Sequence, residues 1–158
     1  MEYRRAVSAD VPLLTLLRLD MRRERETTVP PSDTEAFERE VAAYFRTAVA
    51  DGSFVGIIAE EAGEIAGTGG ICFHIHPPSY AVPNGRSACL LNMYTVPKFR
   101  GRGVASGILR KLQEIAVEAG CCKLTLNASA AGKPLYLKFG FTEVVNEMEL
   151  PLPVPPGK

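Results

Sequence analysis

The sequence lacks the features that mark several large functional classes. Its 18 basic and 18 acidic residues leave no net charge, so we expect no nucleic-acid partner and no attraction to an acidic membrane. No apolar run approaches the roughly 20 residues of a membrane-spanning helix. The start of the chain, residues 1–5, lacks the apolar segment of a signal peptide. These absences predict a cytoplasmic protein.

Cysteine and histidine are also sparse, and their spacing does not indicate a metal centre. The four cysteines show no Cys-x-x-Cys pair and each belongs to an apolar stretch, which is typical of buried free thiols: Cys72, Cys89, Cys121 and Cys122. His74 and His76 alternate along one apparent strand and so share a face, but the sequence singles out no further ligand. We expect no metal, and we interpret both histidines first as strand residues.

Two common nucleotide-binding motifs are missing as well. A P-loop requires Ser or Thr after its Gly-Lys pair, but Gly132 and Lys133 are followed by Pro134. No Gly-x-Gly-x-x-Gly stands near an N-terminal crossover with an acidic residue downstream. What remains is a different glycine-rich turn, at Gly101 and Gly103.

The hydrophobic pattern predicts an α/β fold with one core. We expect a single domain over residues 1–150, followed by a proline-rich tail over 151–158. A strand, a helix and a strand between residues 87 and 127 form a crossover, which makes those two strands parallel. Periodicity and turn residues predict strands at 3–7, 53–60, 65–75, 87–96, 121–127 and 141–150, and helices at about 10–26, 32–51, 104–119 and 130–139.

Two helix starts carry their own signals. Asp10 precedes Pro12, a residue tolerated only in the first turn, so Asp10 is predicted to cap the first helix. Ser32 and Glu35 have the spacing of a capping box for the second. A long loop with three prolines, residues 77–85, is interpreted as a wall or lid of a cleft or as a passive connection.

The glycine turn has the layout of a phosphate site. An apolar strand runs into Arg100, Gly101, Arg102 and Gly103, and Val104, Ala105 and Ser106 then open an amphipathic helix. Glycine lets the backbone approach a ligand closely, and the first N–H groups of a helix have no intrahelical partner. Together with the helix dipole, these groups favour binding of an anion.

At this turn the chain resembles the GCN5-related N-acetyltransferase (GNAT) family. The family's acyl-CoA motif, Arg/Gln-x-x-Gly-x-Gly/Ala, is matched by Arg100-x-x-Gly103-x-Ala105, and a second family region is matched by residues 124–127 and 136–141. The resemblance implies a mixed, mostly antiparallel sheet of six to seven strands flanked by four helices. It also implies a V-shaped split between the two central parallel strands and acetyl-CoA as cosubstrate.

The resemblance also implies roles for individual residues. The backbone of Met93, Tyr94, Thr95 and Val96 is expected to pair with pantetheine, and the turn from Arg100 to Ser106 to hold the pyrophosphate. Asn127 matches a position that bonds the pantetheine amides, with capping of the next helix as the competing interpretation. Tyr136 matches the tyrosine that returns a proton to the departing thiolate as general acid.

The acceptor is expected to be a primary amine of a small molecule or peptide, bounded by the first two helices and the loop at 77–85. Acidic residues there could attract a cationic amine: Glu24, Glu26 and Asp33. The general base stays open among His74, His76 and Glu60, or Asn92 or Tyr94 acting through ordered water. The same motifs would also suit a CoA-binding module without turnover, or an O-acetyl or longer-acyl transferase. A possible homodimer is allowed, and the acceptor's identity stays open.

Overall fold

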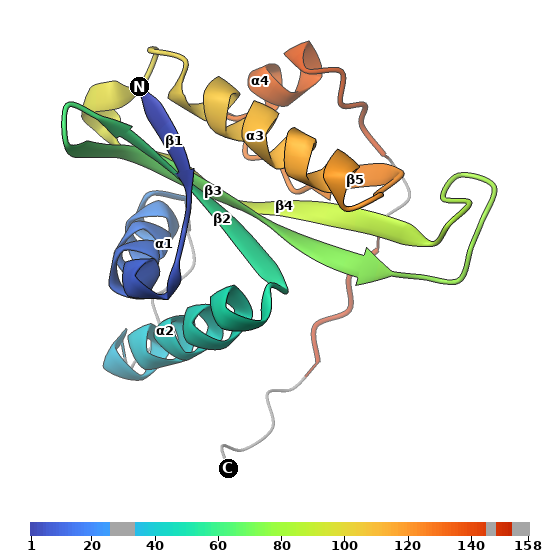
Figure 1. Cartoon of the computed structure of the whole chain (residues 1–158), viewed down its shortest axis with the longest axis horizontal. Coiled ribbons are helices and arrows are strands. Elements are labelled where there is room, and N and C mark those ends of the chain that lie inside the picture. Colours follow the sequence, from blue (N-terminus) through green and yellow to red (C-terminus); the bar gives the residue numbers. More distant parts are fainter. Residues whose placement is uncertain (26–33, 145–147, 153–158) are drawn as a thin grey trace. The chain divides into compact units, whose positions relative to one another are not determined.

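The computed structural model of the protein describes residues 1–25, 34–144 and 148–152. The chain divides into two compact units, Met1–Asn127 and Ala128–Lys158. The first unit holds β1 (Glu2–Arg5), α1 (Val11–Arg25), α2 (Thr34–Asp51), β2 (Phe54–Glu61), β3 (Glu64–Ile75), β4 (Arg86–Thr95), α3 (Val104–Glu118) and β5 (Lys123–Leu126), and the second holds α4 (Lys133–Lys138). Figure 1 shows this order along the chain.

The first unit is built on one sheet whose strands follow the order of the sequence. Strands β1 to β4 pair antiparallel with their neighbours, whereas β4 and β5 are parallel. A two-residue turn joins β2 to β3, and both Ala62 (φ 52°) and Gly63 (φ 79°) adopt the left-handed conformation that such a turn requires. The parallel pair is joined by α3, as the predicted crossover demands.

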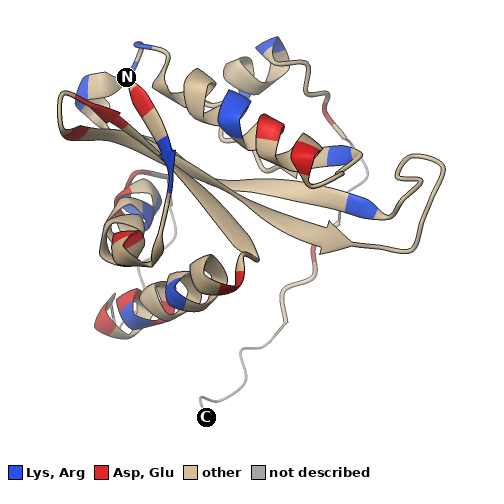
Figure 2. Cartoon of the chain, viewed as in Figure 1, with Lys and Arg blue, Asp and Glu red and all other residues tan. Residues whose placement is uncertain are grey.

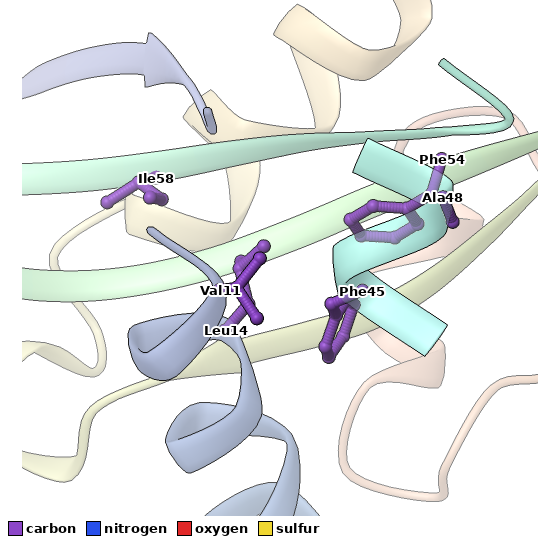
Figure 3. Close-up of a cluster of buried hydrophobic side chains, with 6 residues drawn as sticks. All are labelled: Val11, Leu14, Phe45, Ala48, Phe54 and Ile58. Atoms are coloured by element: carbon purple, nitrogen blue, oxygen red, sulfur yellow. The ribbon is translucent and has the colours of Figure 1, made fainter. Parts of the chain in front are cut away.

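Helices cover both faces of this sheet. In Figure 1, α1 and α2 lie together on one face and α3 lies on the other. The core between these two helices and the sheet contains buried apolar side chains from α1, α2 and β2. Figure 3 shows six of them: Val11, Leu14, Phe45, Ala48, Phe54 and Ile58. Rings of Phe45 and Phe54 meet edge to face, with centroids 5.2 Å apart. Burial of these apolar surfaces is the main stabilising contribution.

The other face packs α3 very close to the sheet, because glycine stands at the contact points. A Cβ atom at Gly107 of α3 would lie 2.0 Å from the Tyr3 hydroxyl of β1. A Cβ atom at Gly69 of β3 would lie 2.4 Å from Met93 Sδ and 2.6 Å from Ile108 Cγ2. A side chain at either position would force these neighbouring side chains to move.

The predicted order of helices and strands agrees with the structure up to α4, but the predicted number of strands is wrong. The described residues form five strands, not six to seven. Residues 141–144 and 148–150 contain no strand, although the pattern predicts one over 141–150, and residues 145–147 lie outside the described ranges. A strand needs a partner for its backbone hydrogen bonds, and an apolar alternating pattern alone does not supply one.

Two local predictions also need correction. The Asp10 carboxylate does not reach forward to cap α1; it accepts the Val7 N–H at 2.8 Å and two bonds from the Arg4 guanidinium at 2.8 and 2.9 Å. The four thiols are free, but Cys122 is exposed and the other three are only partly buried. Ser32 of the predicted capping box lies outside the described residues.

Candidate functional site

The sheet opens between its two parallel strands. β5 pairs with β4 only from Ser87 to Leu90, whereas β4 continues to Thr95. On the opposite side the β3 ladder continues, because Tyr94 lies across from Thr68 and the Val96 N–H bonds the Ala66 carbonyl at 3.0 Å. Main-chain groups alternate in direction along a strand. The N–H and C=O groups of Thr95, and by the same alternation those of Met93, therefore face the side that β5 has left.

A β-bulge lies directly before this open edge. Leu91 lies opposite Gly70 and Tyr94 opposite Thr68, so Asn92 and Met93 together face the single residue Gly69. Asn92 has φ 56° and is only 7% exposed. Its Oδ1 atom accepts a hydrogen bond from Arg18 Nη1 of α1 at 2.6 Å. Helix α1 therefore holds the point at which β4 changes its register with β3. Beyond this point β4 no longer pairs with β5.

The glycine turn follows this open edge and leads into α3. Gly101 (φ 74°) and Gly103 (φ 82°) both have left-handed backbones, and apart from the adjacent residues of the chain no heavy atom lies within 4 Å of a Cβ placed at either position. No side chain caps the start of α3 in the described part of the chain, and the Gly107 N–H bonds the Gly103 carbonyl at 3.0 Å. The N–H groups of Val104, Ala105 and Ser106 precede that bond. The turn therefore presents unclaimed donors in an open space, as the sequence predicts.

The basic side chains of the turn are all paired with acidic ones. Lys98 pairs with Glu64, Arg100 with Glu24 and Arg102 with Glu61. The acids come from α1 and from the β2–β3 hairpin, and Figure 2 likewise shows residues of both signs mixed along α1, α2 and α3. Each of these six side chains is partly exposed to solvent. The turn is therefore electrically balanced, so its main-chain donors and the helix dipole carry its attraction for an anion.

Glu24 connects α1 to both parts of the site. It lies in the last turn of α1, where its Oε1 atom accepts the Tyr94 hydroxyl at 2.8 Å and its other oxygen pairs with Arg100. These two partners hold the pKa of Glu24 below its usual range. Glu24 is thus engaged with the protein and is not free to attract an amine, contrary to the expectation from the sequence; Glu26 and Asp33 lie outside the described residues.

Tyr94 is a poor candidate for the general base. Its ring packs against Leu17 and Met21 of α1, and burial together with the bond to Glu24 raises the pKa of Tyr94 to about 12. The hydroxyl therefore stays protonated at neutral pH and already donates its proton to Glu24. By the alternation described above, the main-chain groups of Tyr94 and Val96 face β3, so the predicted pairing with pantetheine applies only to Met93 and Thr95.

Of the other base candidates, the two histidines lie far from the open edge, whereas Glu60 lies at the same end of the sheet as Thr95. His74 lies opposite Ser87, five residues along the ladder from Gly69, which faces Met93; this corresponds to about 17 Å. His76 lies just beyond the end of β3, with Nε2 3.0 Å from Ser87 Oγ. Glu60 of β2 is held by Arg4 of β1 at 2.7 Å. The histidines therefore cannot reach an amine bound beside Met93, and the Glu60 carboxylate is already paired with Arg4.

The loop at 77–85 likewise lies at the opposite end of β4. It begins beyond the bond between the His76 N–H and the Gly85 carbonyl, 2.8 Å long, and it projects from that end of the sheet in Figure 1. The expectation that this loop bounds the acceptor is therefore wrong for the edge near Thr95. The side of β4 that faces α1 and α2 contains different polar groups, including Arg18 and the Tyr44 hydroxyl, which lies 3.2 Å from Cys72 Sγ.

Asn127 and Tyr136 are the two predicted residues outside this turn. Asn127 is exposed and follows Leu126, the last β5 residue paired with β4, so it stands where the two strands part. It does not cap α4, because no side chain does, and the Gly132 N–H bonds Ser129 Oγ at 3.1 Å. Tyr136 belongs to α4 in the second unit, where its ring meets Phe141 edge to face at 5.8 Å. The roles of both residues remain predictions.

The described ranges hold neither a metal-binding cluster nor a membrane-spanning helix. Residues 1–25, 34–144 and 148–152 contain no group of three or more His, Cys, Asp or Glu side chains that could hold a metal ion. Over the same ranges, no helix has the length and apolar character needed to cross a membrane.

Comparison with known sequences identifies a family and several relatives that match part of the chain. A family model described as "Acetyltransferase (GNAT) family" matches residues 16–141. Thialysine N-epsilon-acetyltransferase of Bos taurus is 40% identical over 48 residues, or 30% of this chain and 28% of that protein. A probable glucosamine 6-phosphate N-acetyltransferase 2 of Oryza sativa subsp. japonica is 46% identical over 44 residues, or 28% of this chain and 26% of that protein. Each alignment thus spans under a third of the curated relative's length.

Solved structures match nearly the whole chain. A crystal structure of a predicted acetyltransferase with acetyl-CoA from Clostridium acetobutylicum is 36% identical, with a TM-score of 0.86 and 95% of each chain covered. A GCN5-related N-acetyltransferase from Ralstonia eutropha JMP134 is 26% identical, with a TM-score of 0.85, and the match covers 96% of this chain and 97% of that one.

Proposed function

Since the chain belongs to the Acetyltransferase (GNAT) family, we propose that it transfers the acetyl group of acetyl-CoA directly to a primary amine. One observation carries this proposal: the unpaired edge of β4 from Leu91 to Thr95 leads into an uncapped helix start at Val104. An extended amide-bearing arm can pair with the first, and a pyrophosphate can bind the second.

The residues present fit the parts of acetyl-CoA. The N–H groups from Gly101 to Ser106 would hold the pyrophosphate, where the open space at both glycines leaves room for a ligand. Met93 and Thr95 would offer main-chain groups to the pantetheine arm, and Asn127 would bond its amides from the neighbouring strand. The similarity to a structure that contains acetyl-CoA, over 95% of each chain, supports this assignment.

The chemistry needs few side chains. The amine nitrogen attacks the acetyl carbonyl carbon, a C–N bond forms and the C–S bond breaks. A main-chain N–H of the β4 edge would stabilise the charge that develops on the carbonyl oxygen. Tyr136 would return a proton to the sulfur as general acid. The amine's own proton would leave to water, because Tyr94 is held protonated, Glu60 is paired with Arg4, and His74, the nearer histidine, is about 17 Å from Met93 along the sheet.

The acceptor class rests on the relatives' names and on the polar groups beside β4. The relatives are named as N-acetyltransferases of thialysine and of glucosamine 6-phosphate, so a primary amine is the class that we assign. The acceptor would approach from the side of α1 and α2, where Arg18 and Tyr44 lie. Its identity within that class is a matter for a substrate panel.

The test combines binding and turnover. Acetyl-CoA should raise the melting temperature, and a panel of primary amines should reveal a substrate through release of free thiol and a product heavier by the mass of one added acetyl group. Tyr136→Phe should lower kcat by about 100-fold, the usual lower range for a general acid. Tyr80→Phe is the matched control, because Tyr80 is fully exposed on the loop at 77–85 and should leave kcat unchanged.

The other outcomes are equally informative. Stabilisation by acetyl-CoA without turnover on any amine would favour a CoA-binding module. A heavier product on a hydroxyl, or transfer of longer acyl groups only, would identify a different acyltransferase. Absence of any stabilisation would refute the proposal.

A further inference from the structure

The Arg100 side chain lies across the edge at which pantetheine is expected to bind. Its Nε atom donates a hydrogen bond to the Thr95 carbonyl at 3.1 Å. Its Nη2 atom pairs with the Glu24 carboxylate, and its guanidinium lies 5.9 Å from the centre of the Tyr94 ring. The Tyr94 hydroxyl donates to the same carboxylate at 2.8 Å. Thr95, Arg100, Glu24 and Tyr94 therefore form one connected set of contacts. The set joins α1, the open edge of β4 and the glycine turn.

These contacts occupy a hydrogen-bond acceptor, the Thr95 carbonyl, that a ligand on this edge would need. The Thr95 carbonyl faces the side that β5 has left, and it is one of the few main-chain acceptors on that edge. An amide N–H of an added strand bonds such a carbonyl directly. With Arg100 held in front of it, the carbonyl is engaged by a cationic donor, which an amide of the added strand would have to displace.

We propose that the ion pair of Glu24 and Arg100 forms a latch across the open edge of β4; this inference rests on the proposed function. Acyl-CoA must break the pair when it binds. The pantetheine arm takes the Thr95 carbonyl, and Arg100 moves from Glu24 toward the anionic part of the ligand. Glu24 is then a positioning residue: it acts through Arg100 and sets how readily the pantetheine arm docks.

The neighbouring pair of Arg102 and Glu61 supplies a matched comparison. It belongs to the same turn, carries the same charges, and its guanidinium lies 5.3 Å from the Phe99 ring. Both arginine side chains are 50% exposed. Within the described residues, only Arg100 of the two bonds the carbonyl of Thr95. Loss of either acid should change phosphate binding to a similar extent, but only loss of Glu24 should change binding of the pantetheine arm.

The experiment measures the dissociation constants of CoA and of ADP by calorimetry for the wild type, Glu24→Gln and Glu61→Gln. The ADP used carries a 3′-phosphate, as the ADP part of CoA does, and lacks only the pantetheine arm, so the ratio Kd(ADP)/Kd(CoA) isolates the contribution of that arm. We expect Glu24→Gln to raise this ratio about fivefold, a modest effect for a partly exposed, charge-assisted bond. Glu61→Gln should tighten both ligands equally and leave the ratio unchanged.

A second variant removes the latch from the other side. Arg100→Ala should also raise the ratio, even though it weakens ADP and CoA by removing a cation near the phosphates. An unchanged ratio in both Glu24→Gln and Arg100→Ala would overturn the latch. A lower ratio in Glu24→Gln would also overturn it, since Glu24 would then be preparing the edge for pantetheine. If wild-type protein binds neither ligand, the proposed function fails before the latch is tested.

Discussion

Asn92 has two properties that three substitutions can separate. Its side chain accepts a charge-assisted bond from Arg18, and its backbone has a positive φ of 56° within the bulge of β4. Ala removes both the bond and the tolerance of that backbone. Gly removes only the bond, whereas Asp keeps an acceptor and the preference of short polar residues for this conformation.

The expected losses of stability follow from these two contributions. A hydrogen bond to a charged group contributes about 1.5–3 kcal/mol, and Asn92 is only 7% exposed, so solvent replaces little of it. In the left-handed region, a residue such as Ala costs about 1 kcal/mol more than Gly or a hydrogen-bonded Asn. We therefore expect Asn92→Ala to lower the free energy of unfolding by about 3 kcal/mol and Asn92→Gly by about 2 kcal/mol. Asn92→Asp should stay within about 1 kcal/mol of the wild type.

Urea unfolding at equilibrium, followed by circular dichroism, measures all three differences on one scale. Affinity for CoA should follow the same order, because the bulge precedes the main-chain groups of Met93 and Thr95. Equal losses in the Ala and Gly variants would show that the backbone conformation contributes nothing. A loss for Asp as large as that for Ala would refute the role of the bond to Arg18.

Three further predictions concern the frame around the site. Gly107→Ala should destabilise the fold by about 2 kcal/mol, since the new Cβ would lie 2.0 Å from the Tyr3 hydroxyl; a urea midpoint within error of the wild type would contradict this packing. Ala62→Asn should raise stability by about 0.5 kcal/mol, because Asn tolerates the positive φ of this turn better than Ala, and a lower melting temperature would count against it. The Arg4 guanidinium holds the pKa of Asp10 below its usual range, so this stabilisation is present above about pH 4 and is lost as the pH falls through the lowered pKa. Asp10→Asn should therefore lose less stability than the wild type between pH 7 and pH 3, and equal losses would disprove the linkage.

The glycine turn and α3 could be predicted from the sequence because their signals are local. The apolar stripe of α3 repeats every three or four residues, and its observed range, Val104–Glu118, agrees with the predicted 104–119. The left-handed backbones of Gly101 and Gly103 likewise follow from the residue type. Local patterns therefore located the candidate anion site.

The electrostatics of the site could not be predicted in this way. The partners of Arg100 and Arg102 are Glu24 and Glu61, which are 76 and 41 positions away in the chain, and no spacing rule connects them. The bulge at Asn92 could not be predicted either. Its register depends on pairing with β3, and its side chain is held by Arg18 of α1. A zero net charge was the only sequence feature that agreed with a balanced turn. Long-range pairing, set by the assembled sheet, decided these features.

The most direct test of the central claim is an NMR titration of 15N-labelled protein with CoA. If the turn and the open edge bind the ligand, amide signals of Gly101 to Ser106 and of Met93 and Thr95 should shift. The signal of Gly85, at the opposite end of β4, should stay in place. Binding of CoA that moves the Gly85 region and leaves the signals of the turn unchanged would contradict the account.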